Sequence, residues 1–468
     1  MKKRIENVKI AYIGGGSQGW AKRLMNDLAL EARISGTVAL YDIHPEAARQ
    51  NAKIGNLLSE REEAVGKWTY EATGDIQEAL TDADFVIISI LPGSFQEMAS
   101  DVHVPEKYGI YQSVGDTVGP GGMIRALRTI PIYKKIAESI KQYSPEAWVI
   151  NYTNPMTLCT RTLYEVFPAI KAFGCCHEVF DVQHLLADMV EEATGEKVER
   201  RQDIHVNVIG INHFTWIDRA SYQNIDLLPL YKQFALKYAE TGFEKEPGSW
   251  ERSVFSSANR VKFDLFNRYG LIAAAGDRHL AEFMPPVYLE SPEKVTEWKF
   301  HLTPVDFRIN DQQSKMERTQ KAAAGEEHFE LAPSGEEGVA IIAALLGLEE
   351  LVTNVNVPNN GQIANLPKGA VVETNAVLRF NSVQPVLAGS LPADVHGLVS
   401  RHVANQETIL RAALDENRQL ALNAFINDPL VEPIGLKQAE KLFNEMMDNT
   451  KEWIGGGFSH DQNAYASS

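Results

Sequence analysis

Short apolar segments alternate with longer segments of helical periodicity over the first third of the chain. An apolar run bounded by glycine or polar residues is typical of a buried strand. The expected strands cover 9–13, 38–42, 84–91, 148–152, 172–175 and 206–211. Amphipathic helical patterns separate them, as at 20–30. Strands that alternate with helices predict the α/β class, with a Rossmann-like, doubly wound parallel sheet covered on both faces.

Helical periodicity dominates after about residue 225, and the strand candidates there are confined to 354–357 and 370–374. We therefore expect the parallel sheet to be followed by a larger, mostly helical α+β domain, with the boundary near residue 200. No low-complexity linker separates the two parts. The sequence thus predicts one shared interface with the functional site at the junction.

Composition narrows the classes of partner. The chain has 468 residues, of which 62 are acidic and 45 basic, for a net charge of −17. This acidic balance argues against nucleic acid and anionic membranes as partners, because both attract positive surfaces. No apolar run is long enough to span a bilayer. Three cysteines cannot form a disulfide framework, so we expect a cytoplasmic protein.

A glycine-rich turn follows the first expected strand. Gly14, Gly16 and Gly19 satisfy the pattern G-x-G-x-x-G at the start of a helix, where a pyrophosphate can approach backbone N–H groups. Asp42 ends the second expected strand and is suited to accept hydrogen bonds from an adenosine ribose. The arrangement predicts NAD binding over residues 1–200 and favours NAD over NADP. The alternative is a glycine-rich turn without a ligand.

A cysteine and a histidine follow two other expected strands. Cys176 lies in the segment GCCHEV, and His213 lies in GINHFTW. A thiolate and an imidazole at strand ends can converge on one cation, although two ligands are too few for a closed zinc site. An open site completed by substrate oxygens fits Mn²⁺ or a similar divalent ion. The alternatives are a buried cysteine that only packs and a core histidine that is only hydrogen-bonded.

Two further segments carry polar groups. Asn154 precedes Pro155, which holds it extended so that its amide can face a hydroxylated ligand. The glycine-rich loop 115–122 leads into a helix that carries Arg125 and Arg128. The loop is either a lid or an anion clamp, and the arginines are alternatively a solvated helix face.

Together, several motifs resemble glycoside hydrolase family 4, the NAD- and divalent-metal-dependent glycosidases. In chain order, they are IGGGSQGW, DTVGPGGMIRALRTIP, NYTNPM, GCCHEV and VNVIGINHFTW, followed more thinly by AAAGDRHLAEF, VNVPNNGQIANLP and VETNA. The segments GCCHEVF and GINHFTWI are most similar to the α-galacturonidase branch.

The resemblance implies cleavage of α-galacturonides or related α-glycosides through oxidation and elimination. NAD⁺ takes a hydride from C3 of the sugar, a base removes the acidified C2 proton, and the C1–O bond breaks. Water then adds, and the hydride returns to C3. The metal, Mn²⁺ or a similar ion, acts as a Lewis acid for the C3 oxyanion and the enediolate.

By the same resemblance, Cys176 and His213 would hold the metal, and Asn154 would hold the sugar hydroxyls beside it. His177 is expected to assist departure of the C1 oxygen, since imidazole titrates near neutrality. Alternatively, His177 does not contact the metal but orients the residues that bind it.

The base at C2 is expected in the segment Gly276–His279, where some family members carry a tyrosine. Asp277 is the first candidate and His279 the second. Arg278 is expected to pair with the carboxylate of a uronate substrate. Each of the three is alternatively part of a structural ion pair.

Two competing functions share part of this pattern. A 2-hydroxy-acid dehydrogenase of the malate or lactate type has the same fingerprint and acid but needs no metal. A non-catalytic NAD-binding sensor would not need polar groups clustered at strand ends. By resemblance we expect residues 201–468 to bind substrate and metal and to mediate assembly into a homodimer or homotetramer.

Overall fold

Six parallel strands form the first part of a single large sheet. The computed structural model describes residues 4–327, 330–454 and 458. The parallel strands follow the order β6-β5-β4-β1-β2-β3, which is the strand order of a Rossmann fold. They are β1 (Ile5–Ile13), β2 (Ile34–Tyr41), β3 (Trp68–Thr73), β4 (Phe85–Ile88), β5 (Trp148–Asn151) and β6 (Lys171–Gly174).

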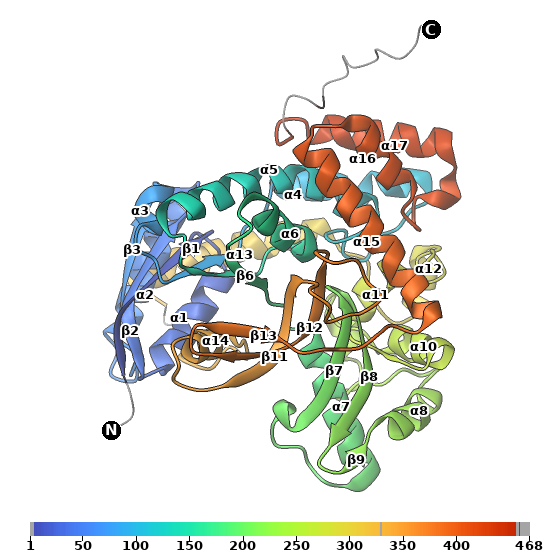
Figure 1. Cartoon of the computed structure of the whole chain (residues 1–468), viewed down its shortest axis with the longest axis horizontal. Coiled ribbons are helices and arrows are strands. Elements are labelled where there is room, and N and C mark those ends of the chain that lie inside the picture. Colours follow the sequence, from blue (N-terminus) through green and yellow to red (C-terminus); the bar gives the residue numbers. More distant parts are fainter. Residues whose placement is uncertain (1–3, 328–329, 455–457, 459–468) are drawn as a thin grey trace, which may run out of the picture.

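Helices cover both faces of these strands (Figure 1). Along β1, Ile10 and Tyr12 enter one buried cluster and Ala11 and Ile13 enter another, because successive side chains of a strand point to opposite faces. Helices α1, α2 and α14 contribute to the first cluster, and α5 and α6 contribute to the second. The helices of this part are α1 (Trp20–Leu30), α2 (Pro45–Ser59), α3 (Ile76–Leu80), α4 (Phe95–His103), η1 (Pro105–Tyr108), α5 (Gly119–Tyr143), α6 (Met156–Val166) and α7 (Glu178–Thr194).

The sheet continues past β6 with antiparallel strands, in the order β6-β11-β12-β7-β8-β10. The segment 206–211, expected as a strand, lies within β7, which runs antiparallel to β12 and β8. The added strands are β7 (Ile204–Ile211), β8 (Phe214–Tyr222), β9 (Ile225–Asp226), β10 (Ile272–Ala273), β11 (Leu351–Pro358), β12 (Val371–Arg379) and β13 (Ser382–Pro385).

One row of paired residues crosses the junction between the two parts of the sheet. Gly174 at the end of β6 pairs with Asn356, Asn356 pairs with Glu373, and Glu373 pairs with Gly210 near the end of β7. The ends of β6 and β7 therefore stand at the same level of the sheet. The register therefore places Gly174 and Gly210 in one row, although β6 and β7 run antiparallel to each other.

Helices dominate the rest of the chain. Helices α15, α16 and α17 gather beside α5 (Figure 1). No helix within the described ranges has both the length and the apolar character needed to cross a bilayer. The remaining elements are η2 (Arg201–Asp203), α8 (Leu228–Lys237), α9 (Ser249–Arg252), α10 (Arg260–Tyr269), α11 (Asp277–Phe283), α12 (Pro292–Glu297), α13 (Val305–Ala324), α14 (Gly338–Leu345), α15 (Ala393–Leu414), α16 (Arg418–Ile426), η3 (Glu432–Ile434) and α17 (Leu436–Asn449).

The predicted fold class is confirmed: a Rossmann-like sheet is followed by a larger, mostly helical α+β part. The structure adds that the strands of both parts belong to one sheet. The predicted boundary at residue 200 falls between α7 and β7, where the sheet has no break. The division into two domains remains a prediction.

Candidate active site

The glycine-rich turn and Asp42 meet at the carboxyl end of β1. Gly14 has φ of +95°, and a Cβ atom there would lie 2.0 Å from the carbonyl oxygen of Ser89, so only glycine fits. The backbone N–H of Gly16 donates to Oδ2 of Asp42 at 2.8 Å. Space is open around Gly19, which precedes α1 and makes no side-chain cap. Open backbone at a helix N-terminus beside an acid fits a dinucleotide.

His213 lies in the two-residue turn between β7 and β8, with φ of +65°. Its Nδ1 contacts Oγ1 of Thr117 at 2.8 Å, and its side chain is buried. Burial and the neighbouring His279 lower the pKa of His213 to about 4. The ring is therefore neutral at pH 7, which is the form that binds metal ions.

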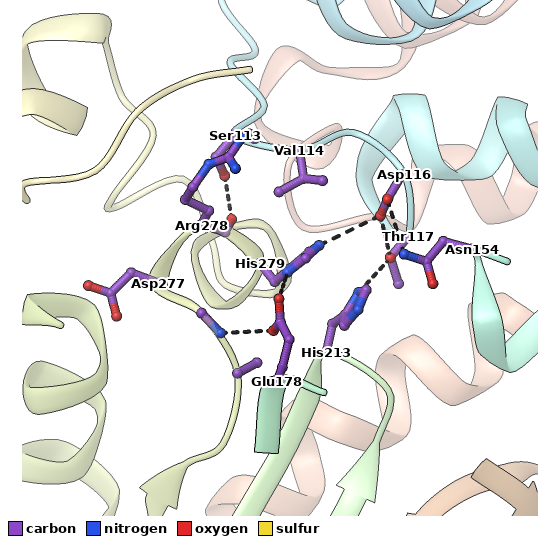
Figure 2. A network of polar contacts seen from close by, with 12 residues as sticks. Ser113, Val114, Asp116, Thr117, Asn154, Glu178, His213, Asp277, Arg278 and His279 are labelled. Atoms are coloured by element: carbon purple, nitrogen blue, oxygen red, sulfur yellow. Dashed lines mark hydrogen bonds and ion pairs between the residues drawn. The ribbon is translucent and has the colours of Figure 1, made fainter. Parts of the chain in front are cut away.

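His279 stacks on His213, with ring centroids 3.7 Å apart (Figure 2). Its Nδ1 pairs with Oε1 of Glu178, and its Nε2 lies 3.7 Å from Oδ1 of Asp116. Burial alone would lower the pKa of His279, but the carboxylates of Glu178 and Asp116 outweigh burial and raise it to about 10. The site thus holds a neutral imidazole against an imidazolium flanked by two carboxylates.

Asp116 connects this pair of histidines to the segment after β5. Oδ2 of Asp116 accepts from Nδ2 of Asn154 at 3.1 Å, and Oδ1 accepts from Oγ1 of Thr117 at 2.7 Å. Oδ1 of Asn154 is buried and has no partner within the described chain, so it is available to a sugar hydroxyl. Asn154 is thereby connected to His213 through Asp116 and Thr117, and its contact with a sugar stays a prediction.

One group of three residues is suited to hold a metal ion. Ligand atoms of Asp116, His213 and His279 lie within 4.8 Å of one another. Cys176 is not part of this group, although its thiol lies close enough to Asn212, the neighbour of His213, for that side chain to influence its pKa. Burial and nearby carboxylates raise the pKa of Cys176 well above its ordinary value. A cation would replace the thiol proton, so these residues fit a divalent ion.

Asp277 does not join the cluster. Its carboxylate accepts from the backbone N–H groups of Val261 and Lys262, both at 3.2 Å, and lies 3.4 Å from Nζ of Lys262. Figure 2 shows it directed away from His279. Asp277 caps the N-terminus of α10, where a carboxylate stabilises unpaired N–H groups. The structure therefore favours the second candidate, His279, over Asp277 as the residue of this segment that faces the site.

Arg278 and His177 are not members of the group that could hold a metal ion. Nη2 of Arg278 donates to the carbonyl oxygen of Ser113 and to Oγ1 of Thr303. The side chain of His177 is half exposed, and its Nδ1 lies 3.9 Å from Oε1 of Glu336. Its ring lies 6.2 Å from that of Trp20, which opens α1. His177 therefore lies beside the start of α1 and close enough to His213 to influence its pKa.

Sequence reasoning missed three residues of the network: Asp116, Thr117 and Glu178. The first two belong to the loop 115–122, for which the sequence predicts a lid or an anion clamp. Glu178 follows His177 directly, at the start of α7. The available signal for Glu178 is a carboxylate in the first turn of a helix that follows a strand end. Its partner, His279, is 101 residues away along the chain.

The fold and the site define a class of protein: a Rossmann-type α/β protein with a glycine-rich turn after β1 and a group of acidic and imidazole side chains that could hold a metal ion. The model of family 4 glycosyl hydrolases matches residues 9–192, and that of their C-terminal domain matches 208–431. The chain belongs to family 4 of the glycosyl hydrolases. It is therefore a glycoside hydrolase, which confirms the predicted family and excludes the dehydrogenase interpretation.

Several relatives match the chain over nearly its whole length. The α-galacturonidase of Thermoanaerobacter italicus is 59% identical, covering 97% of this chain and 98% of that protein. The α-galacturonidase of Bacillus subtilis is 58% identical, covering 95% and 97%. Among solved structures, one described as a glucosidase, lplD from Bacillus subtilis, has a TM-score of 0.90 at 58% identity, covering 94% of this chain and 100% of that chain.

A more distant structure shows the shared fold. The 6-phospho-α-glucosidase from gut microorganisms, solved with NAD and Mn²⁺, is 22% identical with a TM-score of 0.79. It covers 96% of this chain and 99% of that chain.

Proposed function

We propose that the protein is an NAD- and divalent-metal-dependent α-galacturonidase that releases galacturonate from α-galacturonides. Support comes from α-galacturonidases that are 58–60% identical over nearly the whole chain and from the constellation of polar groups described above. Bound NAD⁺ supplies a hydride acceptor for C3, and a divalent ion such as Mn²⁺ supplies a Lewis acid for the sugar oxygens.

The residues that would hold NAD⁺ and the metal ion are those predicted from the sequence, together with Asp116. Gly14, Gly16 and Gly19 would face the pyrophosphate, and Asp42 would face the ribose hydroxyls. His213 and Cys176 would hold the metal. Asp116 joins them, because its carboxylate lies within reach of the ring of His213.

The base at C2 is proposed to be His279 rather than Asp277. Glu178 fixes the ring through Nδ1 and leaves the buried Nε2 without a hydrogen bond in the described chain. Beside a bound cation, the neutral ring of His279 is favoured, so that Nε2 can accept a proton. A carboxylate that orients an imidazole is a recurring general-base arrangement.

The remaining roles concern the substrate. Asn154 would bind the C2 and C3 hydroxyls through its unpartnered oxygen. Arg278 would bind the uronate carboxylate, since no ion pair among the described residues occupies its guanidinium. His177 would assist departure of the C1 oxygen, and its half-exposed position suits a leaving group that departs into solvent.

The proposal also includes the cellular setting expected from the sequence. We place the protein in the cytoplasm, in line with three cysteines that form no disulfide. We further propose a homodimer or homotetramer, as the family resemblance suggests.

One observation carries the proposal: the stacked rings of His213 and His279, whose centroids are 3.7 Å apart, with ligand atoms of Asp116 and both histidines within 4.8 Å of one another. Such a pair would supply a metal ligand and a proton acceptor side by side, which supports elimination across C1 and C2. The test is hydrolysis of 4-nitrophenyl α-galacturonide in deuterated water with NAD⁺ and Mn²⁺. We expect galacturonate labelled with deuterium at C2, and no net NADH. Hydrolysis without C2 deuterium, and with normal rates for substrates deuterated at C2 or C3, would refute elimination.

A further inference from the structure

Two arginine side chains meet on one aromatic ring beside the site. The guanidinium carbon of Arg278, at the start of α11, lies 5.4 Å from the ring centre of Phe255. That of Arg308, in the first turns of α13, lies 5.2 Å from the same centre. Phe255 is itself 49% exposed, so the pair stands at an open face of the protein.

Neither arginine is neutralised within the described chain. Arg278 donates only to the oxygens of Ser113, Thr303 and His301, and Nε of Arg308 is buried without a partner. By contrast, the buried Arg128 forms a two-fold ion pair with Asp101. Two uncompensated cations near each other cost free energy. Such an arrangement is kept where an anion binds.

The arginine pair is electrostatically connected to the cluster of Asp116 and the histidines. Burial lowers the pKa of Arg308, and the Asp116 carboxylate opposes that effect more than any other group. Arg278 precedes His279 directly on α11. An anion held by the arginines would therefore lie close to a sugar whose C2 and C3 oxygens face Asp116 and His213.

We propose that Arg308, together with Arg278 and on the platform of Phe255, forms the subsite that recognises the C6 carboxylate of the sugar. This assignment rests on the proposed function. The planar guanidinium of Arg308, whose Nε has no partner among the described residues, can present paired N–H donors to a carboxylate, which gives geometric as well as electrostatic selectivity. Arg278 adds its charge and the N–H groups of Nη1, because its Nε and Nη2 already donate to protein oxygens. Arg308 thereby makes the enzyme specific for uronates and contributes no proton transfer.

The experiment compares 4-nitrophenyl α-galacturonide with its C6 methyl ester, which keeps the sugar and the leaving group but removes the charge. The kcat/KM of each substrate is measured with NAD⁺ and Mn²⁺ for the wild type and for Arg308→Gln. We expect the variant to lose about 10- to 100-fold on the acid, as for loss of hydrogen bonds to a charged group, and about twofold or less on the ester. Arg308→Lys should lie between the two, because it keeps the charge but not the paired donors.

The matched control is Arg318→Gln on the same helix, an exposed arginine that pairs with Glu327. It should leave the acid-to-ester ratio at the wild-type value. A wild-type ratio in Arg308→Gln, or a wild-type enzyme that cleaves acid and ester equally, would overturn the subsite while leaving the galacturonidase activity intact. A wild-type enzyme that cleaves neither substrate would instead contradict the proposed function. An unfolded Arg308→Gln would leave Arg308→Lys to decide, since an unchanged ratio in that variant also refutes paired donation.

Discussion

Replacing Glu178 by Gln would change one hydrogen bond of the histidine network and keep the other. Glu178 accepts from Nδ1 of His279 through Oε1 and from the backbone N–H of Gly276 at 2.8 Å through Oε2. The amide oxygen of Gln can still accept from Gly276, which directs its NH₂ group at Nδ1. The ring must then carry its proton on Nε2, and that nitrogen can no longer accept the C2 proton.

The expected magnitude follows from this exchange. A positioned general base contributes about 10²- to 10⁴-fold to a rate, so kcat of Glu178→Gln should fall by about that factor. Loss of one charge-assisted hydrogen bond costs about 1–3 kcal/mol of folding free energy, which a protein of this size tolerates. Affinity for NAD⁺ should remain unchanged, because Glu178 does not contact the glycine-rich turn.

The assay combines kcat with the kinetic isotope effect of substrate deuterated at C2. In Glu178→Gln, proton removal becomes slower and should limit the rate, so the isotope effect should rise. Glu192→Gln, on the same helix and paired at the surface with Lys237, is the matched control and should behave as the wild type. A kcat within about threefold of the wild type, or an unchanged isotope effect, would refute the base assignment to the Glu178–His279 pair.

Three further predictions address the cofactor, the metal and stability. Asp42→Ala should weaken NAD⁺ binding and narrow the preference for NAD⁺ over NADP⁺, since the carboxylate accepts from Gly16 and is proposed to bind the ribose. Fluorescence titration with both cofactors checks this, and affinities equal to those of the wild type would contradict it. Cys176→Ser should abolish activity and weaken Mn²⁺ binding while fold and NAD⁺ affinity persist; full activity of a chelated wild-type preparation would rule out the metal mechanism. His402 is buried, and burial lowers its pKa to about 4. Its contribution to stability is complete above the unfolded pKa near 6.5 and is lost as pH falls from 6.5 to 4, by up to ~3 kcal/mol. The free energy of unfolding, measured in urea at pH 7 and pH 4.5, should decrease more in the wild type than in His402→Gln. Equal decreases in the two proteins would disprove the predicted pH dependence.

The sequence predicts what is local in this site. The glycine-rich turn and Asp42 can be predicted because the strand, the turn and the helix are neighbours in the chain. Strand ends also indicate Cys176 and His213. What joins His279 to Glu178 and Asp116 is the register of antiparallel strands and the placement of α11, which are long-range and leave no local signal.

The choice between Asp277 and His279 shows the same limit in physical terms. The two residues are separated by two positions on a helix, which turns them about 200° apart. One therefore faces the site when the other faces α10, and the sequence does not indicate which face of α11 packs inward. A carboxylate is chemically the more familiar base, so residue type alone favours Asp277, on the side of the helix that faces α10.

The shared sheet has a consequence for how this protein can be divided or recombined. One buried cluster combines residues of β1 and α1 with residues of α14, β11 and β12. On the side away from β5, β6 is hydrogen-bonded to β11. A fragment that ends near residue 200 would expose that edge and the apolar face beneath α14, which are the features that promote aggregation. A chimaera that exchanges the second half for that of a relative must therefore carry α14, β11 and β12 from the donor of the first strands.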